Sequence, residues 1–217
     1  MYFKPSRKGG IVKQYHIIGI GLLASILVAG CAGTGERIDL KVPMANMAGD
    51  KAAPASSATV SIEPFEDQRS DRSRLGTRFH LWGGESHFNV SSGTLGEGSA
   101  QAFAHFLKGK GWNVTVAKGN GAAGADITVT GKLVAISVDA ASGIGQTTLN
   151  AKSRMVVQVT NHADGSQVRE TLTSGGTNQV FWFDSEDAQE LLNELYSKSF
   201  EKFAADTKLD GKILKLR

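Results

Sequence analysis

The chain has 217 residues, with 24 Lys and Arg against 21 Asp and Glu, and a single cysteine. Four of the basic residues and none of the acidic ones fall in the first thirty residues, so the remainder holds 20 basic and 21 acidic residues. This balance excludes nucleic-acid or anionic-lipid binding driven by net charge. The single cysteine excludes an internal disulfide framework.

The first thirty residues have the pattern of a cleaved secretory signal. A basic segment precedes an apolar run from Ile17 to Ala29, which is too short to cross a bilayer comfortably. The run ends in "LVAGC", which resembles the signal of bacterial lipoproteins. We therefore predict cleavage between Gly30 and Cys31 and acylation of Cys31 with palmitate-type chains. The rival interpretation is an ordinary thiol after a cleaved signal. Several acyl chains together give a stable membrane anchor.

The residue after the cysteine bears on localisation. Ala32 stands where an aspartate would direct an enterobacterial lipoprotein to the inner membrane. This favours the outer membrane, with the domain facing the periplasm. Residues 1–30 are thus the signal peptide, 31–57 the lipidated cysteine and a flexible tether, and 58–217 a single periplasmic domain. Arg37 to Pro43 ("RIDLKVP") is open to a second interpretation, a short strand laid on the domain.

The first half of the domain begins with a strand and continues into a long loop. "ATVSIEPF" (58–65) alternates apolar and polar residues, as a half-buried strand does. No such period follows over 66–93, which we interpret as an ordered loop. Thr94 and Glu97 then form a capping box, which predicts a helix. The next strand is "WNVTVA" (112–117).

The second half predicts three strands and a helix. "ADITVTGKLVAISVDA" (125–140) changes its apolar phase near Gly131, which predicts a bulge or bend there. Two further strands are joined by a hairpin turn at 161–166, and the last helix spans about 185–205. A basic tail, 208–217, is expected to add an edge strand. The fold is therefore α+β, in the order β-α-β-β-β-β-α, mostly antiparallel with two helices on one face.

Three motifs suggest chemistry, and we reject each. Residues 119–124 match GxGxxG, but a strand follows where a dinucleotide site needs a helix, so we expect no cofactor. His80, His87, Glu85, Asp67 and Asp71 have no metal-site spacing, so we expect no metal. We find no GxSxG nucleophile turn, and we expect the protein not to be an enzyme.

The segment 65–84, "FEDQRSDRSRLGTRFHLWGG", carries balanced charge. Its arginines alternate with acids, which suits local ion pairs that hold a long loop and suits phosphate binding poorly. Long loops in compact domains are often functional, and exposed aromatic groups often mark partner surfaces. The candidate partner contacts are Arg69, Arg74, Arg78, Leu81, Trp82, Phe181 and Trp182. Burial of the aromatic residues in the core is the competing interpretation.

The chain resembles the YajG-like family of uncharacterised bacterial outer-membrane lipoproteins. The resemblance is carried by the anchored tether, "VSIEPFEDQRS", "AQAFAHFLKGKGW" and "NAKSRMVVQVTNHADGSQVRETLTSGG". It implies a periplasmic α+β domain and transfers no catalytic residue. A weaker likeness is to auxiliary lipoproteins of ABC-type transport systems. Our leading hypothesis is a non-catalytic domain that binds an envelope protein; the alternative is a lipid-handling transport accessory. The sequence predicts no oligomeric state.

Overall fold

The computed structural model describes residues 35–43, 57–91, 93–117 and 124–217. The described residues form one compact unit, Gly35–Arg217. The signal peptide, Cys31 and all but the last glycine of the GxGxxG match lie outside the described residues. Among the residues described, none of the helices has both the length and the hydropathy that a bilayer crossing needs.

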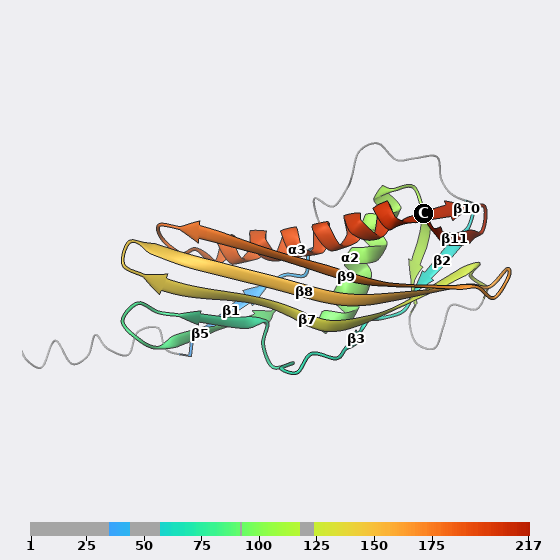
Figure 1. Ribbon diagram of the computed structural model, residues 1–217. Coiled ribbons are helices and arrows are strands. Elements are labelled where there is room, and N and C mark those ends of the chain that lie inside the picture. The colour runs from blue at the N-terminus through green and yellow to red at the C-terminus, as the bar shows by residue number, and fades with distance from the viewer. Residues whose placement is uncertain (1–34, 44–56, 92, 118–123) are drawn as a thin grey trace, which may run out of the picture. The chain divides into compact units, whose positions relative to one another are not determined.

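The unit contains two helices and eleven strands among the described residues (Figure 1). Their bounds, in chain order, are β1 Arg37–Leu40, β2 Thr59–Ile62, β3 Glu66–Asp67, β4 Gly76–Phe79, β5 Glu85–Val90, α2 Leu95–Gly109, β6 Asn113–Val116, β7 Ile127–Gly143, β8 Gln146–Asn161, β9 Gln167–Val180, α3 Ser185–Asp206, β10 Thr207–Asp210 and β11 Ile213–Leu216.

Three long antiparallel strands, β7, β8 and β9, form one half of the sheet, with β9 at its edge. Alternate residues of β8, such as Leu149, Met155 and Val157, are buried, and the residues between them face outward. The other edge of β7 pairs in parallel with three short strands: β2, β3 and β4. β6 then pairs with β2, β5 with β4, and β1 with β5. The predicted α+β class with two helices and a mostly antiparallel sheet is confirmed.

Both helices begin where the sequence predicts. The Thr94 side chain accepts from the Glu97 backbone N–H, and Asp184 caps α3 in a second capping box. The helices pack against each other on the buried face of the sheet, where Phe103 of α2 lies 4.8 Å from Phe200 of α3 between ring centroids. The Tyr196 and Ser99 hydroxyls join the helices by a buried hydrogen bond of 2.7 Å.

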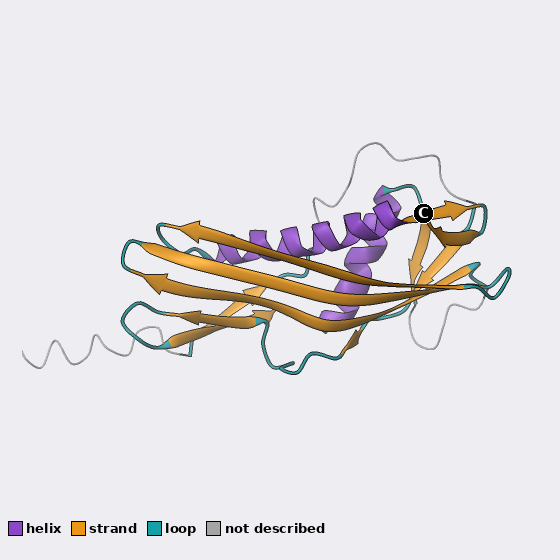
Figure 2. Cartoon of the chain, in the orientation of Figure 1, coloured by secondary structure: helices purple, strands orange, loops and turns teal. Residues whose placement is uncertain are grey.

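The segment 66–93, expected to be a loop, holds three strands: β3, β4 and β5 (Figure 2). These strands are short, so no long local period predicts them: β4 and β5 pair with each other as a hairpin, and β3 and β4 join the distant strand β7 through two residue pairs each. The segment Arg37–Leu40 is a strand, the second of the two interpretations that the sequence left open.

The bulge or bend expected near Gly131 is confirmed as a shift of register between Leu133 and Ala135. Gly131 itself packs closely, because a Cβ there would lie 2.4 Å from the Phe65 ring. The expectation for the basic tail needs correction: β10 and β11 pair with each other in a separate two-stranded sheet and do not extend the main one.

A buried carboxyl on β9 makes stability depend on pH. Burial, and then the neighbouring Asp206, raises the pKa of Glu170 from 4.5 to about 7, although Lys202 partly opposes the shift. The folded protein therefore holds a proton that the unfolded chain releases, and its stability falls as pH rises from about 4.5 through about 7.

We expect Glu170→Gln to remove this dependence. Relative to wild type, the variant should gain about 1–2 kcal/mol in free energy of unfolding between about pH 5 and about pH 8. Denaturant unfolding at both pH values measures the difference. Glu201→Gln, an exposed change on α3, is the matched control and should show no such trend.

Candidate functional site

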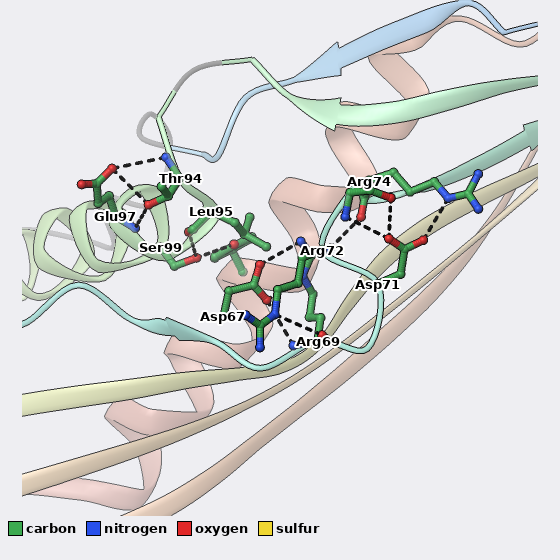
Figure 3. Close-up of polar contacts among 11 residues, drawn as sticks. Asp67, Arg69, Asp71, Arg72, Arg74, Thr94, Leu95, Glu97 and Ser99 are labelled. Carbon is green, nitrogen blue, oxygen red and sulfur yellow. Dashed lines mark hydrogen bonds and ion pairs between the residues drawn. The ribbon is translucent and has the colours of Figure 1, made fainter.

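The charged part of the 65–84 segment is held together by its own ion pairs. Arg69 is buried, its guanidinium binds both carboxylate oxygens of Asp67, and one nitrogen donates to the carbonyl of Arg74 at 2.8 Å (Figure 3). Asp71 accepts from the backbone and hydroxyl of Ser73 and pairs with Arg74 at 3.0 Å. These contacts lower the pKa of Asp71 to about 2, the Ser73 hydrogen bonds first. Arg69 is therefore unavailable to a partner, contrary to its place among the candidate contacts.

The histidines of this segment have separate partners. His80 Nε2 lies 2.7 Å from the Ser86 hydroxyl. His87 contacts Arg74 through Nδ1 at 3.0 Å and Glu85 through Nε2 at 3.5 Å. Within the described ranges, we find no group of three His, Cys, Asp or Glu side chains placed to hold a metal ion.

The exposed aromatic and aliphatic residues gather at one end of the long strands. Of the seven large hydrophobic residues that are exposed in the described part of the chain, six lie there. They come from three places: the β4–β5 turn, the β7–β8 turn and the loop between β9 and α3, which lie together at the left of Figure 1. We call these six residues the apolar tip: Phe79, Leu81, Trp82, Ile144, Phe181 and Trp182.

Strand register brings the three loops together. Phe79 of β4 is paired with Ala141 of β7, just before the β7–β8 turn. At the start of β8, Thr147 is paired with Val180, the last residue of β9 before Phe181. The order across this end of the sheet is therefore the β4–β5 turn, the β7–β8 turn and the β9–α3 loop. A Cβ at Gly145 would lie 3.9 Å from the Phe181 ring, so the second and third loops are in contact.

A half-buried aromatic residue fixes the base of the tip. Phe183 lies with its ring centroid 6.0 Å from that of Phe88, which is fully buried. The Arg78 guanidinium stacks over the Phe183 ring, 4.0 Å from its centroid. Burial lowers the pKa of Arg78, and the nearby Glu36 partly offsets this. The tip is thus built on packed residues, while its own side chains face outward.

The structure sorts the candidate contacts into three groups. Leu81, Trp82, Phe181 and Trp182 come together in the apolar tip, with Trp82 91% and Trp182 80% exposed. Arg78 lies beneath the tip, and Arg69 and Arg74 belong to the ion-paired loop.

Sequence reasoning missed two members of the tip, Phe79 and Ile144. Ile144 stands between two glycines, and a large aliphatic residue in such a turn has no core to enter. This isoleucine between two glycines is the sequence feature that could have predicted an exposed side chain at 144. Ile144 is 89% exposed.

A hollow elsewhere on the described unit has a different chemistry. It measures about 710 Å³ and lies between the segment around β1, the start of α2 and the start of α3. Its lining includes Asp39, Lys41, Glu97, Gln189 and Asn193 and none of the tip residues. The tip is therefore a projecting apolar surface and does not line this hollow.

The described unit is thus an α+β domain with two helices on one face of a mixed sheet and an exposed apolar tip at one end. The chain matches no protein-family model, and no curated protein matches it. Protein XCC0632 from Xanthomonas campestris, of family model DUF330, is a structural neighbour at 9% identity and a TM-score of 0.49, covering 79% of this chain and 92% of its own. Lipoprotein GNA1162 from Neisseria meningitidis is another, at 13% identity and 0.37, covering 68% and 99%. A PelC dodecamer from Paraburkholderia phytofirmans is a third, at 14% identity and 0.30, covering 68% and 92%.

Proposed function

We propose that this protein is a non-enzymatic lipoprotein, anchored by Cys31 in the bacterial outer membrane, whose periplasmic domain binds an envelope partner through the apolar tip. The observation that carries the proposal is the gathering of six exposed hydrophobic residues from three loops on one packed base. Exposed apolar clusters of this kind are typical of interaction sites. The resemblance to the YajG-like lipoproteins agrees with this proposal.

A binding role suits the chemistry of the tip better than a catalytic one. The tip offers hydrocarbon and aromatic side chains, which associate by burial and have no group that transfers protons or attacks a carbonyl. The Asp67–Arg69 and Asp71–Arg74 pairs of the preceding loop are engaged with each other.

The second candidate is a lipid-handling accessory lipoprotein of an ABC-type transport system. The exposed tip favours it, because acyl chains associate with such side chains. The hollow beside β1 has charged side chains in its lining, Asp39, Lys41 and Glu97 among them, which speaks against a purely apolar acyl-chain site there.

Replacement of Cys31 tests the anchor. We expect Cys31→Ser to abolish incorporation of a clickable palmitate analogue and to leave an uncleaved precursor absent from the outer-membrane fraction, because the chain has no other cysteine to acylate. Acyl labelling and membrane fractionation in cells measure both effects. Labelled, outer-membrane-localised Cys31→Ser protein would refute the anchor.

Photo-crosslinking tests the tip as the binding surface. A photoreactive residue at Leu81 should give specific adducts in intact cells. The matched position is Ala163 in the β8–β9 turn, which is also exposed but lies at the other end of the long strands. Equal yields at the two positions would contradict the proposal.

A further inference from the structure

The chain enters the described unit beside the apolar tip. The backbone N–H of Gly35 donates to the carbonyl of Glu85 at 2.7 Å, and Arg37 is then paired with His87. Glu85 is the first residue of β5 and is paired with Phe79, a member of the tip. The first described residue is therefore held at the same end of the sheet as the six exposed hydrophobic side chains.

The distance from this point to the acylated residue is limited by covalent geometry. Cys31 precedes Gly35 by four residues. A fully extended chain spans at most 3.3–3.6 Å per residue, so the two Cα atoms lie within about 14 Å of each other. If Cys31 is acylated, as the proposed function holds, the acylated residue lies within that distance of Gly35, at the end of the sheet that carries the tip.

The side chains of the tip match the boundary of a bilayer. Tryptophan concentrates at membrane–water interfaces because its ring is apolar and its N–H is polar. Trp82 and Trp182 are the two most exposed aromatic residues of the tip, and Phe181 packs against Trp182 with ring centroids 5.4 Å apart. Ile144 adds an aliphatic side chain between them in strand order.

The charged side chains around the tip favour an apolar contact with the membrane. The guanidinium of Arg78 is turned to the Phe183 ring, and the carboxylates of Glu85 and Asp184 flank the tip. This arrangement provides no cationic cluster for anionic headgroups. The polar backbone of the three turns keeps the contact shallow, because unpaired N–H and C=O groups do not enter hydrocarbon.

We propose that the envelope partner of the apolar tip is the bilayer that holds the acyl chains of Cys31, and that the tip inserts into its interfacial region. The protein then has two membrane contacts, one lipid and one protein, and Gly35, at the tip end of the sheet, lies within about 14 Å of the acylated residue. Together they fix the orientation of the domain on the membrane, with the long strands pointing away from it.

Quenching of tryptophan emission by lipid tests this inference. The full-length, lipidated protein is reconstituted in vesicles of phosphatidylethanolamine and phosphatidylglycerol with brominated acyl chains. The chain has three tryptophans. Trp112→Phe leaves Trp82 and Trp182 as the reporters. The matched control is Trp82→Phe with Trp182→Phe, which leaves Trp112, a partly buried residue packed on the core next to β6.

We expect the tip tryptophans to lose about half of their emission or more, as residues at the acyl boundary do, and Trp112 to keep its emission. Replacing phosphatidylglycerol by neutral phosphatidylcholine should leave this result unchanged. Vesicle flotation is measured on the same samples. Protein that floats with unquenched tip tryptophans overturns the inference and leaves the Cys31 anchor standing. Protein that does not float overturns the anchor, and with it both proposals.

Discussion

Phe103→Ala is expected to lower the free energy of unfolding by about 3–5 kcal/mol, the largest loss of any single side-chain truncation considered for this domain. Phe103 is fully buried, and its ring contacts three others: Phe65 at 6.1 Å, Phe200 at 4.8 Å and Phe203 at 5.0 Å between centroids. The change removes the group that joins α2 to α3 and to the segment between β2 and β3. The cavity that remains cannot close, because helices and strands fix its walls.

Chemical denaturation of the full-length protein, followed by circular dichroism, measures this loss. Phe79→Ala is the matched control, since it removes the same ring from a position that is 54% exposed. Its effect should stay within about 0.5 kcal/mol. A loss for Phe103→Ala no greater than that of Phe79→Ala would contradict the described core.

Gly76→Ala is expected to lower the free energy of unfolding by about 3 kcal/mol and to move the β4–β5 turn away from the other two loops of the apolar tip. A Cβ at this position would lie 1.8 Å from the carbonyl oxygen of Val138, which belongs to the backbone of β7 and cannot turn aside. β4 would have to move, and the hydrogen bond from Val138 N–H to the Leu75 carbonyl, 3.0 Å long, would break.

Hydrogen exchange of the β4–β5 amides, together with denaturant unfolding, measures both parts of this effect. Gly143→Ala is the control, because a Cβ there meets only the Gln146 carbonyl oxygen at an ordinary 3.5 Å. If the two alanine variants have the same stability and the same exchange, the close packing of β4 on β7 is wrong.

Local signals in the sequence predicted the helices and the hairpin well. The capping boxes at Thr94 and Asp184 involve residues three positions apart, so they can be recognised without knowledge of the fold. The β8–β9 turn around Gly165, with a φ of 73°, is equally local.

The strands inside 66–93 escaped prediction because they are short: β4 and β5 form a brief hairpin, and the place of β3 and β4 in the main sheet depends on distant partners. β4 is four residues long and joins β7 through Arg78 and Phe79, paired with residues 140 and 141. Nothing within the segment specifies that pairing. The same holds for the tip: Trp82 and Trp182 each stood out as aromatic residues in loops, but their proximity depends on the register of four strands.

The segment 65–84 forms two surfaces of different character. Its charged half, around Arg69 and Asp67, is consumed in internal contacts. Its apolar half, around Leu81 and Trp82, contributes to the exposed tip. The lipid anchor and the tip then act at the same end of the domain.

Spin-label accessibility tests whether the tip lies at the membrane that holds the anchor. Cys31 is the only cysteine and is blocked when acylated, so Ile144→Cys and, separately, Ala163→Cys each introduce one free thiol. The two positions lie at opposite ends of β8, roughly 50 Å apart at 3.3 Å per residue. In vesicle-bound protein, the label at 144 should be relaxed by oxygen and protected from an aqueous nickel chelate, and the label at 163 should show the reverse. Equal exposure of both labels to the nickel chelate would contradict insertion of the tip into the membrane.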